Sequence, residues 1–378
     1  MIGVWIAILL SGVALAQSAA GAVAVWRFTR GSRAARPAYL PPVTVLKPLH
    51  GAEPLLEDAL ASVCAQDYPE WQVVFGVQDS RDTALPIVQR LQGRFPDSDI
   101  AVVVDPTPHG SNRKVANLIN MLPAARHDVL VISDSDMQVA PDWLCRLVAA
   151  LEPAEVGLVT TIYTGLSSPQ SGQIGRFCGQ LGAMQINHYF LPGALLARAM
   201  GRQDCLGATM MMRRDTLLRI GGFAAIANHL ADDNVLGRLV QRLGLKVALA
   251  GTIPATTVSE ATIAALWRHE LRWARTIRAL APLPFAASVL QYPLAWAVLA
   301  VLLAGGTPWS LGWFALVWAL RVLAAREIDK ALGLANRSPL WLLPVRELMS
   351  VAVMTASYAG RRVDWRGYTL QAEGFDPR

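Results

Sequence analysis

The 378-residue chain has a formal net charge of +6, with 53% hydrophobic and only 16% charged residues. Ordinary soluble domains are about 25% charged, so part of this chain is expected to lie in lipid. Nucleic-acid binding is disfavoured because the arginines cluster beside apolar segments, and the four scattered cysteines form no CxxC pair that would indicate a zinc site or a disulfide framework.

An uncharged segment, residues 2–26, opens the chain and is long enough to span the roughly 30 Å hydrocarbon core of a bilayer as a helix. Four arginines follow it: Arg27, Arg30, Arg33 and Arg36. A cleaved signal peptide is the alternative, because residues 14–16 resemble a cleavage site, but no basic segment precedes the apolar run and the run continues past that site. We expect residues 1–27 to be a transmembrane anchor with the amino terminus outside and the following residues in the cytoplasm.

Between about residues 43 and 137 the pattern changes to short, β-branched runs that alternate with helical stretches. Strands are predicted at 43–46, 72–77, 100–104 and 129–132, and helices at 53–65, 82–95 and 114–122. This alternation favours an α/β fold with a doubly wound, mostly parallel sheet, in which ligands bind beyond the carboxyl ends of the strands. Functional residues are therefore expected directly after each strand.

Beyond residue 280 the chain is apolar again. Residues 283–304 and 309–320 are uncharged and predict two spanning helices, while 340–360, apolar apart from Arg346 and Glu347, predicts a segment that spans or is re-entrant. Arg361, Arg362 and Arg366 favour a cytoplasmic carboxyl terminus, which conflicts with an odd number of carboxy-terminal spans, so that number stays open.

The predicted domains follow from these patterns. After the anchor at 1–27 comes a cytoplasmic domain at 40–280, which ends in an interfacial helix at 261–280. Transmembrane or re-entrant helices at 281–360 and a cytoplasmic tail at 361–378 complete the chain.

Acidic side chains stand at the predicted strand ends. Asp134 and Asp136 directly follow strand 129–132, where two carboxylates can share a divalent cation, since Mg²⁺ and Mn²⁺ prefer oxygen ligands beside diphosphate oxygens. A solvated turn is the alternative. Asp79 follows strand 72–77 and would reach the same edge, either to recognise a nucleotide or to cap the next helix.

Other charged residues extend this pattern. Lys47 ends the first strand and Lys114 opens helix 114–122, so both could face a diphosphate or be surface charges. Asp232 and Asp233 begin an amphipathic helix; taken alone they are better explained by capping, but one of them is free to act as a general base.

Two further segments carry candidate residues. His269 and Arg272 lie in a basic helical stretch that could rest on anionic headgroups or bind a departing diphosphate through charged hydrogen bonds. His188 and Gly207 are candidates for an acceptor pocket, although an isolated histidine is more often structural.

An ordered set of motifs runs along the chain: Lys47-Pro48-Leu49 with Gly51, Asp67-Tyr68-Pro69, Val77-Gln78-Asp79, Lys114-Val115 with Asn117-Leu118, the Asp134 turn, Met212-Arg213-Arg214-Asp215, Asp233, Arg272-Trp273, Arg346-Glu347 and Trp365-Arg366. This set resembles the ceramide glucosyltransferase family over nearly the whole chain. Within that superfamily the length, the DSD turn and the HELRW stretch are most similar to bacterial hopanoid-biosynthesis glycosyltransferases, which add N-acetylglucosamine to bacteriohopanetetrol.

The resemblance implies a nucleotide-diphospho-sugar transferase domain of the GT-A kind at 40–280, with inversion at the anomeric carbon. It implies that Asp79 contacts the uridine, that Asp134 and Asp136 hold the ribose and a Mg²⁺ or Mn²⁺ ion, and that Asp233 is the catalytic base. Lys47 and Lys114 are expected on the donor side.

The resemblance also assigns Arg272 and Trp273 to the family's (Q/R)xxRW element, which binds the diphosphate. His269 stands where that element usually has Gln or Arg, so donor binding is expected to depend on pH near neutrality.

The expected reaction is transfer of N-acetylglucosamine from UDP-GlcNAc to a membrane lipid hydroxyl, such as that of a hopanoid, at the cytoplasmic face of a bacterial inner membrane. Ceramide glucosylation from UDP-glucose is the second interpretation. A processive polysaccharide synthase is the third, although such enzymes usually have more spans than the three or four expected here. The expected partners are the UDP-sugar, the lipid acceptor and the bilayer, and not nucleic acid.

Overall fold

The computed structural model describes residues 1–31, 37–167, 172–334, 338–360, 362–365 and 368–371. Arg33, Arg36, Arg361 and Arg366 lie outside these residues. The chain divides into two compact units: unit 1 comprises Met1–Arg30, Pro169–Met200 and Glu260–Arg378, and unit 2 comprises Gly31–Ser168 and Gly201–Ser259. Residues 169–200 and 260–280 of the predicted domain 40–280 thus group with the apolar helices in unit 1.

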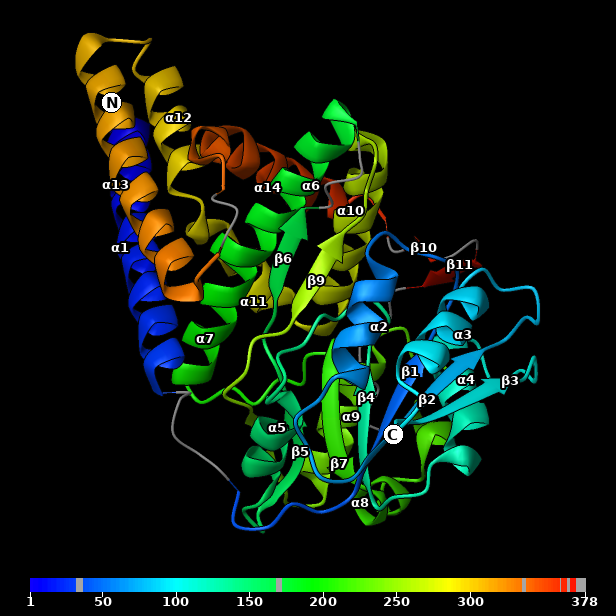
Figure 1. The fold of residues 1–378 in the computed structure, drawn as a ribbon. Helices are drawn as coiled ribbons and strands as arrows, with labels where there is room; N and C mark the ends of the chain where they lie inside the picture. The colour runs from blue at the N-terminus through cyan, green and yellow to red at the C-terminus, as the bar shows by residue number, and fades with distance from the viewer. Residues whose placement is uncertain (32–36, 168–171, 335–337, 361, 366–367, 372–378) are drawn as a thin grey trace. The chain divides into compact units, whose positions relative to one another are not determined.

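Unit 2 is built on a seven-stranded sheet of order β3-β2-β1-β4-β7-β5-β8 (Figure 1). The strands are β1 (Val43–Pro48), β2 (Trp71–Val77), β3 (Asp99–Val104), β4 (Val129–Ser133), β5 (Val156–Thr160), β7 (Thr209–Arg213) and β8 (Lys246–Leu249). The first four strands are parallel to one another, whereas β7 is antiparallel to both β4 and β5. The four strands expected from the sequence are all present, and the sheet is mostly parallel as predicted.

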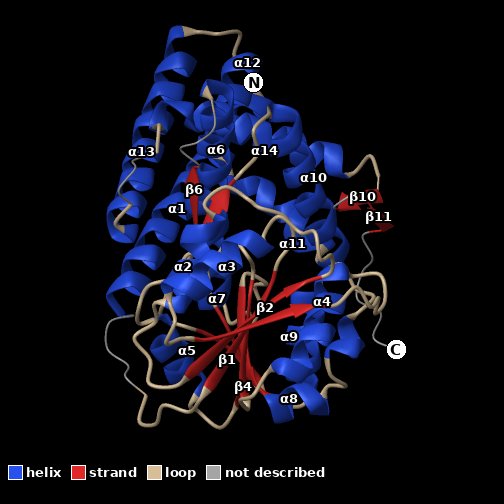
Figure 2. Ribbon diagram, turned by 45° about the vertical axis from the view of Figure 1, so that its right-hand side comes forward, coloured by secondary structure: helices blue, strands red, loops and turns tan. Residues whose placement is uncertain are grey.

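Helices cover both faces of this sheet (Figure 2). They are α2 (Leu56–Cys64), α3 (Leu85–Arg94), α4 (Arg113–Met121), η1 (Leu122–Ala124), α5 (Trp143–Leu151), α8 (Arg214–Arg219), η3 (Phe223–Ile226) and α9 (Asp232–Arg242). A separate pair of parallel strands joins β6 (Thr164–Ser167) to β9 (Ala255–Val258). Because the sheet is covered on both sides, β1, β2 and β4 are mostly apolar and almost fully buried.

Helix α4 packs closely on β2 because Gly76 has no side chain. A Cβ at this position would lie 2.4 Å from Cγ of Met121, and the Asn117 side chain donates a 2.8 Å hydrogen bond to the Gly76 carbonyl. This close contact fixes the helix against the sheet and brings its first turn to the carboxyl edge of the strands.

Unit 1 is largely helical. It contains α1 (Ile2–Gly31), α6 (Gln173–Gln185), a π-helical turn η2 (Ile186–Phe190), α7 (Leu191–Ala199), α10 (Ile263–Leu280), α11 (Pro282–Ala287), η4 (Ser288–Gln291), α12 (Pro293–Leu303), α13 (Pro308–Leu332), η5 (Leu340–Leu342) and α14 (Leu343–Ser357), with the hairpin β10 (Arg362–Trp365) and β11 (Tyr368–Gln371).

Among the described residues, three helical segments are long and apolar enough to cross a membrane: Ile2–Gly31, Pro308–Leu332 and Leu340–Ser357. The segment predicted as a spanning helix at 283–304 is made of two pieces, Pro282–Gln291 and Pro293–Leu303, bent by 68°, and by length and composition the pair could form one broken span. Proline at position 293 supplies no N–H, which allows a helix to start there but not to continue through it. The helix predicted at 309–320 extends to Leu332. In its second half, Arg321 and Asp329 are buried and paired with Glu347 and His188.

Candidate functional site

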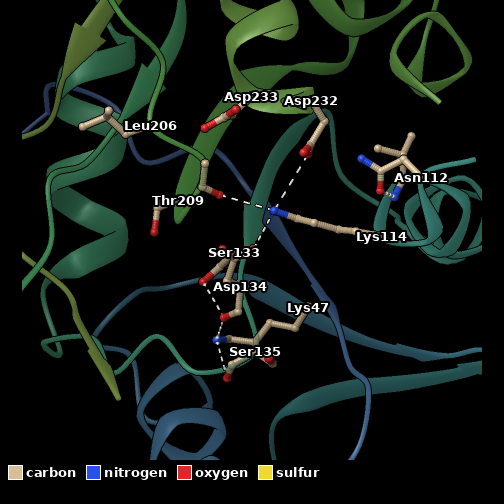
Figure 3. A network of polar contacts seen from close by, with 12 residues as sticks. Lys47, Asn112, Lys114, Ser133, Asp134, Ser135, Leu206, Thr209, Asp232 and Asp233 are labelled. Atoms are coloured by element: carbon tan, nitrogen blue, oxygen red, sulfur yellow. Dashed lines mark hydrogen bonds and ion pairs between the residues drawn. The ribbon is translucent and has the colours of Figure 1, made fainter. Parts of the chain in front are cut away.

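Charged side chains gather at the carboxyl edge of the sheet in unit 2 (Figure 3). Lys47 comes from β1, Asp134 and Asp136 follow β4, Lys114 lies in the first turn of α4, and Asp232 and Asp233 open α9. Segments that are distant in the sequence thus bring five of the predicted acids and lysines, together with Asp232, to one place.

Lys47 is completely buried beneath the turn that follows β4. Its Nζ donates hydrogen bonds to the carbonyl oxygens of Asp134 at 2.7 Å, Ser135 at 3.3 Å and Met137 at 3.3 Å. Burial lowers the pKa of Lys47 to about 8, although Asp136 and Asp134 act in the opposite direction. The ammonium group therefore holds the turn through its main chain, and a direct contact with the donor stays a prediction.

Lys114 lies between the acids of the two segments. Its Nζ is 2.5 Å from Oδ1 of Asp134 and 3.9 Å from Oδ2 of Asp232, and it donates to the Gly207 carbonyl at 3.5 Å. Burial alone would lower the pKa of Lys114, but Asp134 and Asp232 outweigh it and raise the pKa. The lysine is therefore a permanent positive charge at the centre of the site.

The start of α4, which carries Lys114, is tied to the segment before α9. Asn112 caps α4 by accepting from the Val115 N–H at 3.2 Å, and its side-chain amide donates to the His229 carbonyl at 2.8 Å. The Asn112 N–H donates to the Ala227 carbonyl at 2.8 Å. These bonds fix the position of Lys114 relative to the start of α9.

Asp136 is the second carboxylate of the turn, and its side chain accepts a hydrogen bond from the Thr256 hydroxyl. Burial raises the pKa of Asp136, and the charge on Asp134 raises it further. A divalent cation would relieve this repulsion, and carboxylate oxygens are ligands that Mg²⁺ and Mn²⁺ accept. The described residues hold no group of three or more His, Cys, Asp or Glu side chains placed to bind a metal.

Asp233 has the properties of a general base. Its Oδ1 accepts the N–H of Asn234 at 2.7 Å, and burial together with the charge of Asp232 raises its pKa to about 7. The N-cap of α9 is Ala231, with no side-chain capping bond, so the capping alternative does not describe this helix start. The Oδ2 atom of Asp232 is buried and accepts no hydrogen bond from any described residue.

Gly207, predicted on the acceptor side, lies against Asp233. A Cβ at position 207 would be 2.8 Å from Oδ2 of Asp233, closer than real Cβ contacts occur. The neighbouring Leu206 is held by Thr160, whose hydroxyl donates to its carbonyl at 2.6 Å and accepts its N–H at 3.0 Å. The segment that contains Gly207 therefore forms one wall beside the carboxylate.

Asp79 lies after β2, at the same edge of the parallel strands, but is exposed and makes no recorded contact with the other acids. Its Oδ1 accepts the N–H of Arg81 at 2.9 Å, and this bond lowers the pKa of Asp79. Asp82 connects the loop after β2 to the loop after β1, because its carboxylate accepts the N–H of Gly51 at 2.9 Å. It also accepts the N–H of Ala84 at 2.8 Å within its own loop. The uridine contact of Asp79 stays a prediction.

The remaining candidates belong to unit 1. His269 is hydrogen bonded to Glu260 and packs edge-on against Trp273, with ring centroids 4.5 Å apart. Burial would raise the pKa of Glu260, but the hydrogen bond and charge of His269 outweigh it and lower the pKa. Arg272 is on the same helix, α10. The predicted donor-binding roles of His269, Arg272 and Trp273 stay predictions.

His188 is buried in the π-helical turn of unit 1, where its Nε2 lies 2.7 Å from Oδ1 of Asp329. This pairing is compatible with a structural role for His188, and its predicted place on the acceptor side stays a prediction. The contacts of Thr256 with Asp136 and of Asn112 with residues 227 and 229 could not be predicted from the sequence, because only the folded chain brings these segments together.

The profile of glycosyl transferase family 21 matches residues 5–374. Relatives include Ceramide glucosyltransferase 1 of Caenorhabditis elegans, 23% identical over 243 residues that make up 64% of this chain and 51% of the relative. An N-acetylglucosaminyltransferase of Rhizobium leguminosarum bv. viciae is 24% identical over 261 residues, 65% of this chain and 59% of the relative. The chain spans about half the length of the first relatives it matches. A solved mannosyltransferase from Pyrobaculum calidifontis, in complex with GDP-Man and Mn²⁺, is 21% identical with a TM-score of 0.48, and the match covers 92% of this chain and 99% of that one.

Proposed function

Because the chain belongs to glycosyl transferase family 21, we propose that it is an inverting enzyme that moves a sugar from a nucleoside diphosphate to a lipid hydroxyl. The observation that carries this proposal is the carboxylate of Asp233, whose pKa is raised to about 7 at the charged edge of the sheet. A general base works best when its pKa lies near the working pH, because it is then both largely ionised and strong enough to accept a proton.

In the proposed reaction, Asp233 accepts the proton of the acceptor hydroxyl. The hydroxyl oxygen then forms a bond to the anomeric carbon from the side opposite the leaving group, while the bond from that carbon to the diphosphate oxygen breaks. Gly207 leaves room beside the carboxylate for the hydroxyl, since any side chain there would occupy the space next to Oδ2.

Negative charge grows on the departing diphosphate, and the site is built to receive a cation beside it. The ammonium groups of Lys47 and Lys114 face four carboxylates, those of Asp134, Asp136, Asp232 and Asp233, so two negative charges remain when all are ionised. A Mg²⁺ or Mn²⁺ ion held by Asp134 and Asp136 would supply electrostatic stabilisation of the leaving group. Lys47 keeps the turn in place, and Lys114 offers a charge on the same side.

The proposed setting is the cytoplasmic face of a bacterial inner membrane. The candidate membrane helices of unit 1 support a lipid acceptor over a soluble one. The first candidate is transfer of N-acetylglucosamine from UDP-GlcNAc to a hopanoid such as bacteriohopanetetrol, supported by likeness to an N-acetylglucosaminyltransferase. Glucosylation of ceramide from UDP-glucose is the second, supported by likeness to ceramide glucosyltransferases.

The replacement Asp233→Asn tests the assignment, because it keeps the size of the side chain and removes the base. We expect kcat to fall by about 10² to 10⁴ while the Kd for UDP-sugar stays unchanged. UDP release is measured with each donor and each lipid acceptor, and mass spectrometry of the product identifies the pair. Asp128→Asn, at an exposed acid elsewhere in unit 2, is the matched control. Full turnover by Asp233→Asn would refute its role as the base.

A further inference from the structure

Helices α1 and α13 run side by side in the same direction (Figure 1). Near their amino-terminal ends, Trp5 stacks on Trp309 with ring centroids 6.4 Å apart. One to two turns further along both helices, the Trp313 indole donates a 3.0 Å hydrogen bond to the buried Ser11 hydroxyl. The two helices therefore begin at the same level and continue in parallel.

Helix α12 runs in the opposite direction to both. A Cβ at Gly3, near the start of α1, would lie 3.5 Å from Leu303 at the end of α12. Gly305 and Gly306, with φ of +67° and +69°, then turn the chain into α13. The tip of this α12–α13 hairpin, residues 304–308, is uncharged and lies beside the amino terminus of α1.

The opposite ends of α1 and α13 both carry basic residues. Arg27 and Arg30 end α1, and Arg326 and Lys330 lie in the last two turns of α13. Basic residues that flank membrane helices mark the cytoplasmic side. The basic ends of α1 and α13 therefore lie on one side of this bundle, and the uncharged hairpin tip lies on the other side, beside the amino terminus of α1.

Helix α14 has a different relation to the bundle. Figure 1 shows it lying across the direction of α1 and α13 rather than alongside them. Its fully buried Arg346 forms a double hydrogen bond with Glu270 of α10, at 2.6 and 2.7 Å. This bond ties α14 to an amphipathic helix whose opposite face is basic.

The next residue, Glu347, holds the break in the bent helix pair. It accepts the N–H groups of Leu294 at 2.6 Å and Ala295 at 3.3 Å, which are among the first N–H groups of α12 and have no partner within the helix. It also lies 3.4 Å from the Arg321 guanidinium of α13. Charges inside an apolar helical unit persist when they are paired in this way, so the bend before α12 is a stabilised feature of the fold.

We propose that α1, the bent pair α11–α12, and α13 cross the bilayer, and that α14 enters and leaves it on the face where α1 and α13 end. This inference rests on the proposed membrane setting. It gives three crossings and a carboxyl terminus on the same side as the basic end of α1, which removes the conflict between an odd number of carboxy-terminal spans and the basic tail. The exposed side chains of Trp341, Val345 and Leu348, spaced as on one helix face, would contact the acyl chains of that leaflet.

Cysteine labelling of the full-length chain in cells tests this topology. The four native cysteines are replaced, and single cysteines are introduced by Pro308→Cys at the hairpin tip, Lys330→Cys at the end of α13 and Tyr358→Cys just after α14. Arg30→Cys reports the basic end of α1. Each variant is treated with a membrane-impermeant maleimide before and after permeabilisation.

We expect Pro308→Cys to react in intact spheroplasts and the other three to react only after permeabilisation. Reaction of Tyr358→Cys in intact spheroplasts would show that α14 crosses and would overturn the inference, as would protection of Pro308→Cys from the outside. Reaction of Arg30→Cys from the outside would overturn the proposed orientation. Labelling does not depend on sugar transfer, so failure of the proposed reaction and failure of this topology are separate results.

Discussion

A methyl group at Gly207 is expected to displace the Asp233 carboxylate and slow turnover while the fold is retained. The added Cβ would lie 2.8 Å from Oδ2 and 3.1 Å from Cβ and Cγ of Asp233. Favourable contacts between such atoms begin at about 3.5 Å, so the carboxylate oxygen must retreat by roughly 0.7 Å. Because a displacement of about 1 Å in an active site can cost on the order of 10² in rate, we expect Gly207→Ala to lower kcat by about 10-fold.

The assay compares kcat and the donor Kd of Gly207→Ala with those of Gly93→Ala. Gly93 lies in α3 of the same unit, and a Cβ there would meet nothing within 4 Å. The control is expected to match the parent in both quantities, and Gly207→Ala to bind donor normally, since the Gly207 carbonyl that faces Lys114 is retained. A Gly207→Ala enzyme with the kcat of the parent would refute the placement of Asp233 as the base.

Three further outcomes are expected. Lys47→Met removes the hydrogen-bond donor to three main-chain carbonyls of the turn after β4 and should weaken Mn²⁺ binding by about 10-fold. Titration followed by electron paramagnetic resonance measures this affinity, and an unchanged affinity would contradict a positioning role for Lys47. The pKa of Asp233 is raised from 3.8 to about 7, so the stability contributed by its protonated form is complete below pH 3.8, falls progressively above it and is lost once the pH has risen through 7. The gain in stability of Asp233→Asn over the parent should therefore be larger at pH 8 than at pH 5, by on the order of 2–3 kcal/mol, measured by thermal unfolding; a constant difference would argue against the shift. Arg346→Met leaves the Glu270 carboxylate buried without its partner and should lower the free energy of unfolding by about 3–5 kcal/mol. Adding Glu270→Gln to this variant should recover a large part of that loss. Equal losses in the single and double variants would show that the pair does not act as a unit.

Much of the fold could be predicted because the strands of unit 2 are buried on both faces. Such strands appear in the sequence as short, mostly apolar and β-branched runs. The prediction of an α/β domain of the GT-A kind between apolar terminal segments is confirmed, as is the glycosyltransferase class. A helix break at Pro293 is compatible with the proline itself, but the contacts that hold the bend could not be foreseen in the same way. They come from Glu347, which is distant in the sequence and reaches the bend only after α14 has packed.

The site was predicted in part. Asp134, Asp136 and Asp233 stand out in the sequence because each lies at the end of a strand or the start of a helix. The fold brings Asp134 and Asp233 near Lys114, and Asp136 near Lys47. The burial of Lys47 was not visible, since a lysine at a strand end is usually a surface charge and only the turn above it supplies three carbonyl acceptors. The contacts of Asp79 and His269 with substrate are still predictions.

The hydrogen bonds that tie Asn112 to residues 227 and 229 have a mechanical consequence. They join the helix that carries Lys114 to the chain that leads into Asp233, so these two segments form one rigid piece although more than a hundred residues separate them. In the proposed reaction, Asp233 and Lys114 would therefore keep the same position relative to each other. The distance between Asp233 and Lys114 is then set by the protein and not by the bound ligand.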